Sequence, residues 1–400
     1  MKAVILAAGE GKRMRPLTHT RPKVMLPIAG RPILEHLLIQ ARQAQVRDFI
    51  FIVGYHDEQV RNYFGSGGKW GVGIEYCTQR RQSGTADALK MAEGLVDSNF
   101  LVINGDIIVS REDIERMTRG SGGVLGVVEV EDTRGLGVVE VNGDRVVRIH
   151  EKTAEPVSHL VNAGLYLFTP DIFGALSRTV KSPRGEYELT ESLELMMAAG
   201  YRLTCQDIDY WLNLSYPWDL LSANESLLGG TKAQNLGEVE ENVVIRGEVY
   251  IGEGTRVRSG SYIVGPVAIG NGCDLGPNCY IRPATSLGDG CRVGSAVEVK
   301  NSIVMRGSRI PHHNYVGDSV LGENCNLGAG TKIANLRLDG EDIEIAGVGT
   351  GRRKLGAIIG DGVETGINTT INVGSLIGDN ARIGPGAVVS GVVLPDSRIF

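Results

Sequence analysis

In the second half of the chain an aliphatic residue recurs at every sixth position. The first series consists of Ile251, Val257, Ile263, Ile269, Leu275, Ile281, Leu287, Val293, Val299 and Met305. The register breaks near Pro311, and the spacing returns at Leu321, Leu327 and Ile333 and again at Ile359, Ile371, Ile377, Ile383 and Val389. This period predicts a left-handed parallel β-helix, in which each aliphatic side chain points inward from one side of a triangular coil and stacked coils bury a continuous core.

Glycine is unusually abundant, with 55 residues, and the repeat explains the excess. Tight corners between the sides of each coil require backbone conformations that glycine adopts without steric cost. Cys273 and Cys291 are three six-residue steps apart, so we expect them to stack on adjacent coils. The six cysteines form no Cys-x-x-Cys pair, and no histidine spacing supports a zinc site. We interpret them as reduced packing residues of a cytoplasmic protein.

The first half of the chain alternates short apolar runs with amphipathic segments. We expect strands at residues 4–8, 49–53, 73–77, 101–106, 146–150 and 161–166. Helices are expected at 33–45, 56–64 and 86–93, where apolar residues recur with helical spacing. This alternation predicts an α/β domain with a Rossmann-like, doubly wound mixed sheet that is mostly parallel. Ligands of such sheets bind beyond the carboxyl ends of the strands.

Length and charge narrow the possible classes of protein. A chain of 400 residues is long for one core, so we expect two or three domains. The net charge of -6 is mild and indicates neither a nucleic-acid partner nor a membrane surface. The first apolar run is too short for a signal peptide, and no segment is long and apolar enough to span a bilayer.

The first expected strand ends in a loop built to hold phosphate. Gly9 and Gly11 let backbone N–H groups approach an anion. Five cations follow within the same short stretch, namely Lys12, Arg13, Arg15, Arg21 and Lys23. The stretch lacks the Gly-Lys-Ser/Thr ending of a P-loop and the third glycine of a dinucleotide fingerprint. A polar first loop of an ordinary α/β domain is the alternative interpretation.

The same stretch resembles the signature of sugar-1-phosphate nucleotidyltransferases. The matching residues are Leu6, Ala7, Ala8, Gly9, Gly11, Arg13, Met14, Pro22 and Lys23. The resemblance implies that Arg13 and Lys23 are catalytic, with Arg13 on the triphosphate and Lys23 on the α-phosphate or the attacking phosphate. It also implies that the nucleotide is bound by Leu6, Ala7, Gly9, Gln79, Gly84 and Thr85, with Gln79 reading the edge of a pyrimidine.

Further along, the resemblance implies a metal site and a sugar site. Asp106, at the carboxyl end of an expected strand, and Asn213 match the family's two Mg²⁺ ligands, and both offer oxygen atoms. Gly137, Glu151 and Asn162 match positions that bind the sugar and its phosphate. Strand ends and polar turns of other proteins often carry such residues without any ligand.

One interruption of the repeat resembles the acetyltransfer motif of bifunctional uridyltransferase/acetyltransferases. It runs from Ile310 to Asp318, with His312 in the position of the base. The resemblance further implies substrate-binding roles for Arg282, Lys300, Tyr315, Asn326, Asn335 and Lys354, and contact of Ala329 with acetyl-CoA. A histidine near its ordinary pKa suits removal of a proton from an amine. The alternative is that the histidines are merely loop residues. The whole pattern is similar to archaeal members of the group.

Together these features predict a bifunctional cytoplasmic enzyme of UDP-N-acetylglucosamine synthesis, with Mg²⁺ as cofactor and acetyl-CoA as co-substrate. We expect a nucleotidyltransferase domain at 1–228, a linker at 229–241 and an acetyltransferase β-helix at 242–400. The expected partners are UTP, sugar-1-phosphates and acetyl-CoA, and the expected assembly is a homotrimer or higher homo-oligomer. Two alternatives remain: a glucose- or mannose-1-phosphate nucleotidyltransferase with a structural β-helix, and a non-catalytic regulatory subunit.

Overall fold

The computed structural model describes residues 1–151 and 157–400. The chain forms two compact units. The first contains residues 1–10, 21–25 and 33–213, and the second contains 11–20, 26–32 and 214–400. Each unit is described by itself below.

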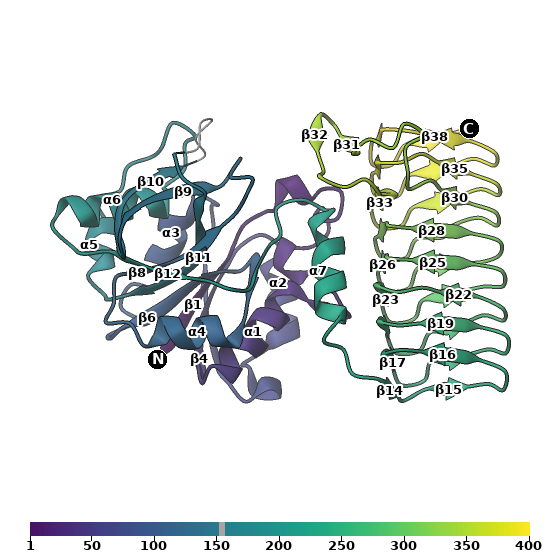
Figure 1. Cartoon of the computed structure of the whole chain (residues 1–400), viewed down its shortest axis with the longest axis horizontal. Helices are drawn as coiled ribbons and strands as arrows, with labels where there is room; N and C mark the ends of the chain where they lie inside the picture. Colours follow the sequence, from purple (N-terminus) through teal and green to yellow (C-terminus); the bar gives the residue numbers. More distant parts are fainter. Residues whose placement is uncertain (152–156) are drawn as a thin grey trace. The chain divides into compact units, whose positions relative to one another are not determined.

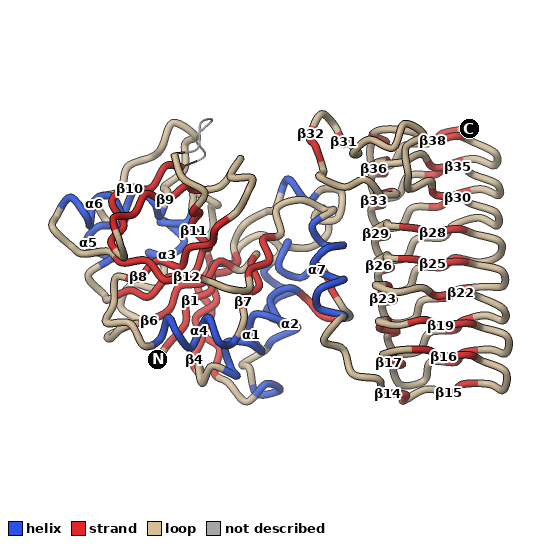
Figure 2. Tube along the Cα trace, in the orientation of Figure 1, coloured by secondary structure: helices blue, strands red, loops and turns tan. Residues whose placement is uncertain are grey.

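The first unit is built around a nine-stranded mixed sheet (Figure 2). Its strands, in spatial order, are β5 (Gly73–Thr78), β4 (Asp48–Val53), β1 (Lys2–Ala7), β6 (Phe100–Asn104), β11 (Leu160–Phe168), β8 (Val124–Glu129), β12 (Thr204–Asp207), β10 (Arg145–Glu151) and β9 (Gly137–Asn142). Strands β5, β4, β1 and β6 are parallel, and β11 enters antiparallel to β6. The expected strands are therefore confirmed, with ends shifted by one or two residues.

Helices cover both faces of this sheet. They are α1 (Ile33–Gln43), α2 (Asp57–Phe64), α3 (Thr85–Lys90), α4 (Arg111–Thr118), α5 (Ile172–Leu176) and α6 (Leu189–Ala198). Alternate residues of β1 point to opposite faces, so that Ile5 packs in one apolar cluster with α1, α2 and α4, whereas Val4 packs in another with α3, α5 and α6. This two-sided packing confirms the prediction of a doubly wound α/β unit. A short antiparallel pair, β7 (Ile107–Val109) and β13 (Trp211–Asn213), lies apart from the main sheet.

The second unit contains coils whose strands form three parallel faces (Figure 1). The first face consists of β14 (Gln234–Asn235), β17 (Val249–Ile251), β20 (Val267–Ile269), β23 (Thr285–Leu287), β26 (Ile303–Val304), β29 (Val320–Leu321), β33 (Ala357–Ile359), β36 (Ser375–Ile377) and β39 (Val392–Val393). The second consists of β15 (Glu238–Val239), β18 (Arg256–Val257), β21 (Asp274–Leu275), β24 (Arg292–Val293) and β27 (Arg309–Ile310), then β34 (Glu364–Thr365), β37 (Arg382–Ile383) and β40 (Arg398–Ile399). The third consists of β16 (Val244–Arg246), β19 (Tyr262–Val264), β22 (Tyr280–Ile281), β25 (Glu298–Lys300), β28 (Tyr315–Gly317), β30 (Lys332–Ile333), β35 (Thr370–Ile371) and β38 (Val388–Val389).

Most coils advance by 18 residues, because residues such as Ile263 and Ile281 are paired. Two sides are one residue shorter, and this corrects the predicted register. Val304, not Met305, pairs with Leu287, and the six-residue spacing then runs straight through Pro311 to Val316. The breaks therefore lie before Val304 and before Leu321, and not near Pro311. Both Val304 and Met305 are buried, so hydrophobicity alone could not distinguish them.

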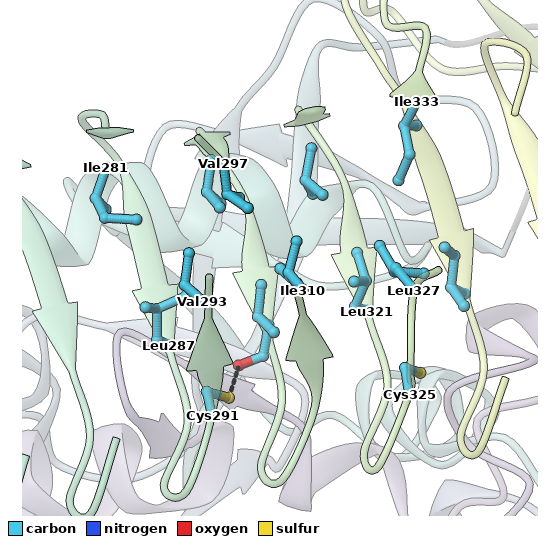
Figure 3. Close-up of a cluster of buried hydrophobic side chains, with 14 of the residues drawn as sticks. Ile281, Leu287, Cys291, Val293, Val297, Ile310, Leu321, Cys325, Leu327 and Ile333 are labelled. Carbon is cyan, nitrogen blue, oxygen red and sulfur yellow. Dashed lines mark hydrogen bonds between the residues drawn. The ribbon is translucent and has the colours of Figure 1, made fainter. Parts of the chain in front are cut away.

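The core of the coils contains aliphatic residues and small thiols (Figure 3). Cys273 and Cys291 lie on adjacent coils as predicted, and all six cysteines are free. The thiol of Cys291 donates to the carbonyl oxygen of Met305 at 3.2 Å. Burial raises the pKa of Cys291 to about 12, and it does the same for Cys325. These thiols therefore remain neutral packing groups at physiological pH.

The corners of the coils repeat a left-handed backbone conformation. One corner position is occupied in successive coils by Gly260, Asn278, Ala296, His313, Gly330, Asn368 and Gly386, all with positive φ. Glycine and asparagine adopt this conformation most easily. The prediction that glycines serve the corners is therefore confirmed. A longer segment between β30 and β33 contains the antiparallel pair β31 (Glu344–Ile345) and β32 (Val348–Gly349).

Helix α7 (Asp219–Leu228) belongs to the second unit and is joined to the coils through a buried amide. Asn224 donates to the carbonyl oxygen of Ala284 at 2.7 Å. Its Oδ1 accepts from the hydroxyl of Ser286 at 2.8 Å and from the N–H of Ala29 at 2.9 Å. Ala29 lies in the turn between β2 (Pro27–Ile28) and β3 (Arg31–Pro32). One side chain therefore connects helix, coil and hairpin.

Every helix in the described ranges is too short or too polar to cross a lipid bilayer.

Replacing Asn224 by Ala removes these bonds and leaves a carbonyl, a hydroxyl and an N–H without a partner in a buried place. We expect Asn224→Ala to lower the free energy of unfolding by about 3 kcal/mol, measured by urea titration of circular dichroism. Glu225→Ala, one residue further on an exposed part of the same helix, is the control. Equal midpoints for both variants would contradict the proposed link.

Candidate functional site

The carboxyl ends of β1 and β6 lie side by side in the first unit. Leu6 is paired with Asn104, and the N–H of Gly105 donates to the carbonyl oxygen of Leu6 at 2.9 Å. A Cβ at Gly105 would lie only 2.9 Å from that oxygen, so the close approach requires glycine. Ala7 ends β1 and Gly9 follows it. The loop predicted to bind the nucleotide and Asp106 therefore start from neighbouring strands.

Lys23 and Asp106 are in direct contact. The ammonium of Lys23 donates to Oδ2 of Asp106 at 2.7 Å, and the lysine side chain is only 9% exposed whereas the carboxylate is 37% exposed. The helical turn η2 (Lys23–Met25) carries the lysine. The pair combines a buried cation with a carboxylate that solvent and ligands can reach.

Asn213 lies beside this pair. In the β13–β7 register Asn213 is opposite Ile107, the residue that follows Asp106. A carboxylate and an amide oxygen are hard oxygen ligands, and Mg²⁺ usually takes few protein ligands and completes its shell with phosphate and water. These two residues fit that donor set. Among the described residues there is no cluster of three or more His, Cys, Asp or Glu suited to a metal.

Gln79 and the following loop form a second cluster in this unit. The Nε2 of Gln79 donates to the carbonyl oxygen of Gly84 at 3.1 Å and to Asp87 at 2.8 Å. These two bonds fix the orientation of the amide group. Gly84 has φ +116°, and any Cβ there would collide with the backbone of Tyr187. The hydroxyl of Thr85 accepts from the N–H of Leu189 at 3.0 Å.

The three predicted sugar-binding residues lie together. Gly137 pairs with Glu151 across β9 and β10, and a Cβ at Gly137 would lie 3.3 Å from Oε2 of Glu151 and 3.7 Å from Asn162. Asn162 donates to the hydroxyl of Tyr166 at 2.9 Å, and burial raises the pKa of that phenol. Glu151 accepts from Arg184 at 3.1 Å. The missing side chain at residue 137 leaves space beside a carboxylate and an amide.

Arg13 belongs to the second unit, in the turn η1 (Lys12–Met14). Its guanidinium lies over the ring of Tyr216, 5.4 Å from the centroid. Tyr216 in turn stacks on Trp218 at 4.8 Å. A guanidinium in this position is attracted by the quadrupole of the aromatic ring.

On the third face of the coils, several predicted residues surround a carboxylate that the sequence did not single out. Asp318 accepts from Lys300 at 3.1 Å and from Asn301 at 2.7 Å, and its side chain is only 3% exposed. It also accepts from Asn335, whose amide donates to the hydroxyl of Tyr315 at 3.2 Å. The structure thus brings Lys300, Tyr315 and Asn335 together.

Two other features shape this cluster, which we call the Asp318 cluster (Lys300, Asn301, Tyr315, Asp318 and Asn335). A Cβ at Gly317 would lie 2.7 Å from the hydroxyl of Tyr315 and 2.8 Å from the amide of Asn335, so a side chain at residue 317 would displace these two groups. Arg282 pairs with Glu298 at 2.7 Å on the same face, and this hydrogen bond raises the pKa of the guanidinium. The arginine is therefore a fixed positive charge.

His312 lies at the corner between the second and third faces, and its side chain is exposed. His313 occupies the left-handed corner position with φ +56°, where other coils have glycine, asparagine or alanine. The two histidines therefore differ: His313 forms the turn, and His312 is presented by it. The next corner is stacked directly on this one, because the N–H of Gly330, which follows Ala329, donates to the carbonyl oxygen of His312 at 2.9 Å.

Two predicted residues lie apart from the Asp318 cluster. Asn326 is on the second face, bridged to Arg309 and Glu364. Lys354 is exposed, and its backbone bridges Leu336 next to Asn335. Within one chain the predicted acetyltransfer residues thus lie on two faces, at the corner between them and, for Lys354, in the segment between β30 and β33.

Sequence reasoning missed Asp318, Glu298 and Gly317. A signal was present for the first, because one coil after Lys300 comes its paired residue Gly317, and Asp318 is the next residue along the chain. Glu298 could be found in the same way, since it precedes Lys300 by two positions on one strand and shares its face. Gly317 carries no sequence signal beyond being a glycine.

Comparisons with known proteins cover the whole chain. Residues 2–229 match the nucleotidyl transferase family, and residues 263–350 match the GMPPB C-terminal domain. A bifunctional sugar-1-phosphate nucleotidylyltransferase/acetyltransferase of Sulfurisphaera tokodaii is 42% identical, over 98% of this chain and 97% of the relative. The bifunctional protein GlmU of Methanocaldococcus jannaschii is 41% identical, over 97% and 95% respectively.

A solved structure matches part of the chain. It is a putative glucose-1-phosphate thymidylyltransferase from Bacillus anthracis in complex with sucrose, with 30% identity and a TM-score of 0.53. The match covers 59% of this chain and 98% of the other. Because relatives with two named activities align with this chain from end to end, the chain belongs to the family of bifunctional sugar-1-phosphate nucleotidylyltransferase/acetyltransferase enzymes.

Proposed function

We propose that this enzyme acetylates glucosamine-1-phosphate and then transfers a uridylyl group to the product, giving UDP-N-acetylglucosamine and pyrophosphate. The observation that carries the proposal is the Asp318 cluster, which includes Tyr315, three residues after His312. A β-helix that served only as a scaffold would not need a buried carboxylate with a lysine and two amides around it, because burying such groups is costly. The nucleotidyl transfer half rests on Lys23, Asp106 and Asn213.

In the first reaction, the amine of glucosamine-1-phosphate attacks the thioester carbon of acetyl-CoA. The C–N bond forms, the C–S bond breaks, and coenzyme A leaves as the thiol. His312 takes the proton that the amine loses. Arg282, Lys300 and Lys354 neutralise the sugar phosphate, while Tyr315, Asn326 and Asn335 orient the ring and Ala329 lies against the coenzyme.

In the second reaction, a phosphate oxygen of N-acetylglucosamine-1-phosphate attacks the α-phosphorus of UTP, and pyrophosphate leaves. No covalent enzyme intermediate is required, so positioning and charge neutralisation do the work. Arg13 holds the triphosphate, and Lys23 neutralises charge at the α-phosphate or at the attacking phosphate. Asp106 and Asn213 would hold Mg²⁺, which lowers the repulsion between the phosphate groups. Gly137, Glu151 and Asn162 bind the sugar.

The fixed amide of Gln79 indicates which nucleotide base the enzyme binds. Its Nε2 has two acceptors, so its Oε1 accepts the N3–H of a uracil ring. Thymine offers the same N–H, so this contact alone does not separate UTP from dTTP. Leu6, Ala7, Gly9, Gly84 and Thr85 form the surrounding nucleotide loop in this proposal.

We also propose a left-handed coil and a homotrimer or higher oligomer, working in the cytoplasm on small molecules. The distribution of the acetyltransfer residues over two faces supports the oligomer, because a second copy can supply Asn326 to the Asp318 cluster. The functional domains are proposed as 1–228 and 242–400, with a linker at 229–241.

The two reactions should be separable by single substitutions. We expect His312→Ala to reduce thiol release from acetyl-CoA and glucosamine-1-phosphate by about 100-fold and to spare pyrophosphate release. Asp106→Asn should reduce pyrophosphate release by a similar factor and spare thiol release. His313→Ala is the matched control, because Ala296 already occupies the equivalent corner.

Two results would contradict the proposal. One is loss of both activities in either variant. The other is a wild type that releases no thiol yet forms pyrophosphate from UTP and glucose-1-phosphate, which would favour the nucleotidyltransferase with a structural β-helix.

The Asp318 cluster gives a finer test. Asp318→Asn keeps the shape of the side chain but leaves the ammonium of Lys300 without its counter-charge. We expect KM for glucosamine-1-phosphate to rise about tenfold, with the rate of pyrophosphate release unchanged. Asp274→Asn removes an exposed ion pair with Arg258 on the second face. It should change neither KM for glucosamine-1-phosphate nor the rate of pyrophosphate release. An unchanged KM in Asp318→Asn would show that the carboxylate does not organise the cluster.

A further inference from the structure

The segment 11–20 carries Arg13 but belongs to the same compact unit as the coils. It has an ordered conformation of its own. The hydroxyl of Thr18 donates to the carbonyl oxygen of Gly11 at 2.9 Å and closes the segment into a loop, and Met14 and Leu17 are buried. The end of this loop is attached to the coils at two points.

Both attachments are made by carboxylates of the β-helix. The imidazole of His19 donates from Nδ1 to Oδ2 of Asp379 at 2.6 Å. The hydroxyl of Thr20 donates to Oδ2 of Asp361 at 2.6 Å. The side chain of Asp379 is only 10% exposed, so its bond is shielded from water. Bonds to a charged acceptor in such a place are stronger than neutral ones.

The same turn position has a simpler role in other coils. Asp289 uses its Oδ1 to accept the N–H of Asn271 at 2.7 Å, which ties one coil to the next. The Oδ1 atoms of Asp361 and Asp379 do the same, accepting from Glu323 at 2.7 Å and from Asp361 at 2.6 Å. Asn271 fills this position with an amide, and its Oδ1 accepts from Glu253 at 2.9 Å. In each of these coils the turn therefore uses only one side-chain oxygen.

The second oxygen of Asp361 and of Asp379 serves the loop instead. We propose that these two aspartates are positioning residues for nucleotidyl transfer, which hold the segment 11–20 so that Arg13 is presented in its triphosphate-binding conformation. A loop ordered in advance spares the substrate the entropic cost of ordering it. The proposal rests on the function proposed above for Arg13.

The consequence is that the β-helix contributes to both reactions through different atoms. The Asp318 cluster lies on the third face, whereas Asp361 and Asp379 lie at the corners between the first and second faces. A change at these corners should affect nucleotide binding without affecting acetyl transfer.

The test is the double variant Asp361→Asn, Asp379→Asn in the full chain. Each amide keeps the Oδ1 that the turn needs, as Asn271 does, and presents an N–H₂ in place of the oxygen that accepts from the loop. We expect KM for UTP to rise about tenfold, with thiol release from acetyl-CoA unchanged. Asp289→Asn alters the same turn position without a loop contact and should leave both activities as in the wild type.

A rescue experiment separates loop positioning from general damage. His19→Asn retains an N–H donor near the place of Nδ1 and should keep KM close to that of the wild type, whereas His19→Ala should raise it. An unchanged KM in the double variant, or equal loss of both activities, would overturn the inference. If the wild type itself fails to release pyrophosphate from UTP, the proposed function fails first, and the two failures are thus distinguished.

Discussion

The advance between paired strands, which is 17 or 18 residues in most coils, governs the second unit. Because parallel pairing places residues one coil apart side by side, a chemical group can be built from positions far apart in the sequence. Lys300 and Asp318 meet in this way, and so do Asp361 and Asp379. The same constraint keeps the aliphatic positions inside, so polar residues can change on the outside without loss of the core.

In the first unit, polar groups are brought together in a different way. Parallel strands β1 and β6 end at one edge, which sets Gly105 against Leu6 and begins the segment that leads to Asp106. The buried ammonium of Lys23 would be costly to hold without a counter-charge, and the carboxylate of Asp106 supplies it. The pair thus stabilises itself before any phosphate arrives, and the exposed side of the carboxylate remains available to a ligand.

Much of this organisation could be predicted from the sequence, and the failures have physical causes. The six-residue period predicted which residues form the core and where the coils turn, because burial of aliphatic residues is a local pattern. It could not decide between Val304 and Met305, since both are apolar and a coil can lose one residue at a turn. Prediction of the role of Asp318 required the coil length as well as the motif. The attachment of His19 to Asp379 spans 360 positions, and no local pattern contains it.

The repeat also explains how functional side chains can be added to such a fold with little loss of stability. The corners meet two structural requirements: a left-handed residue and, at several corners between the first and second faces, one side-chain oxygen that accepts from the neighbouring coil. His313 meets the first requirement and leaves His312 exposed for a reaction. Asp379 meets the second with Oδ1 and leaves Oδ2 for His19. In both places the structural demand is met by one group, so its neighbour could be selected for function without weakening the coil.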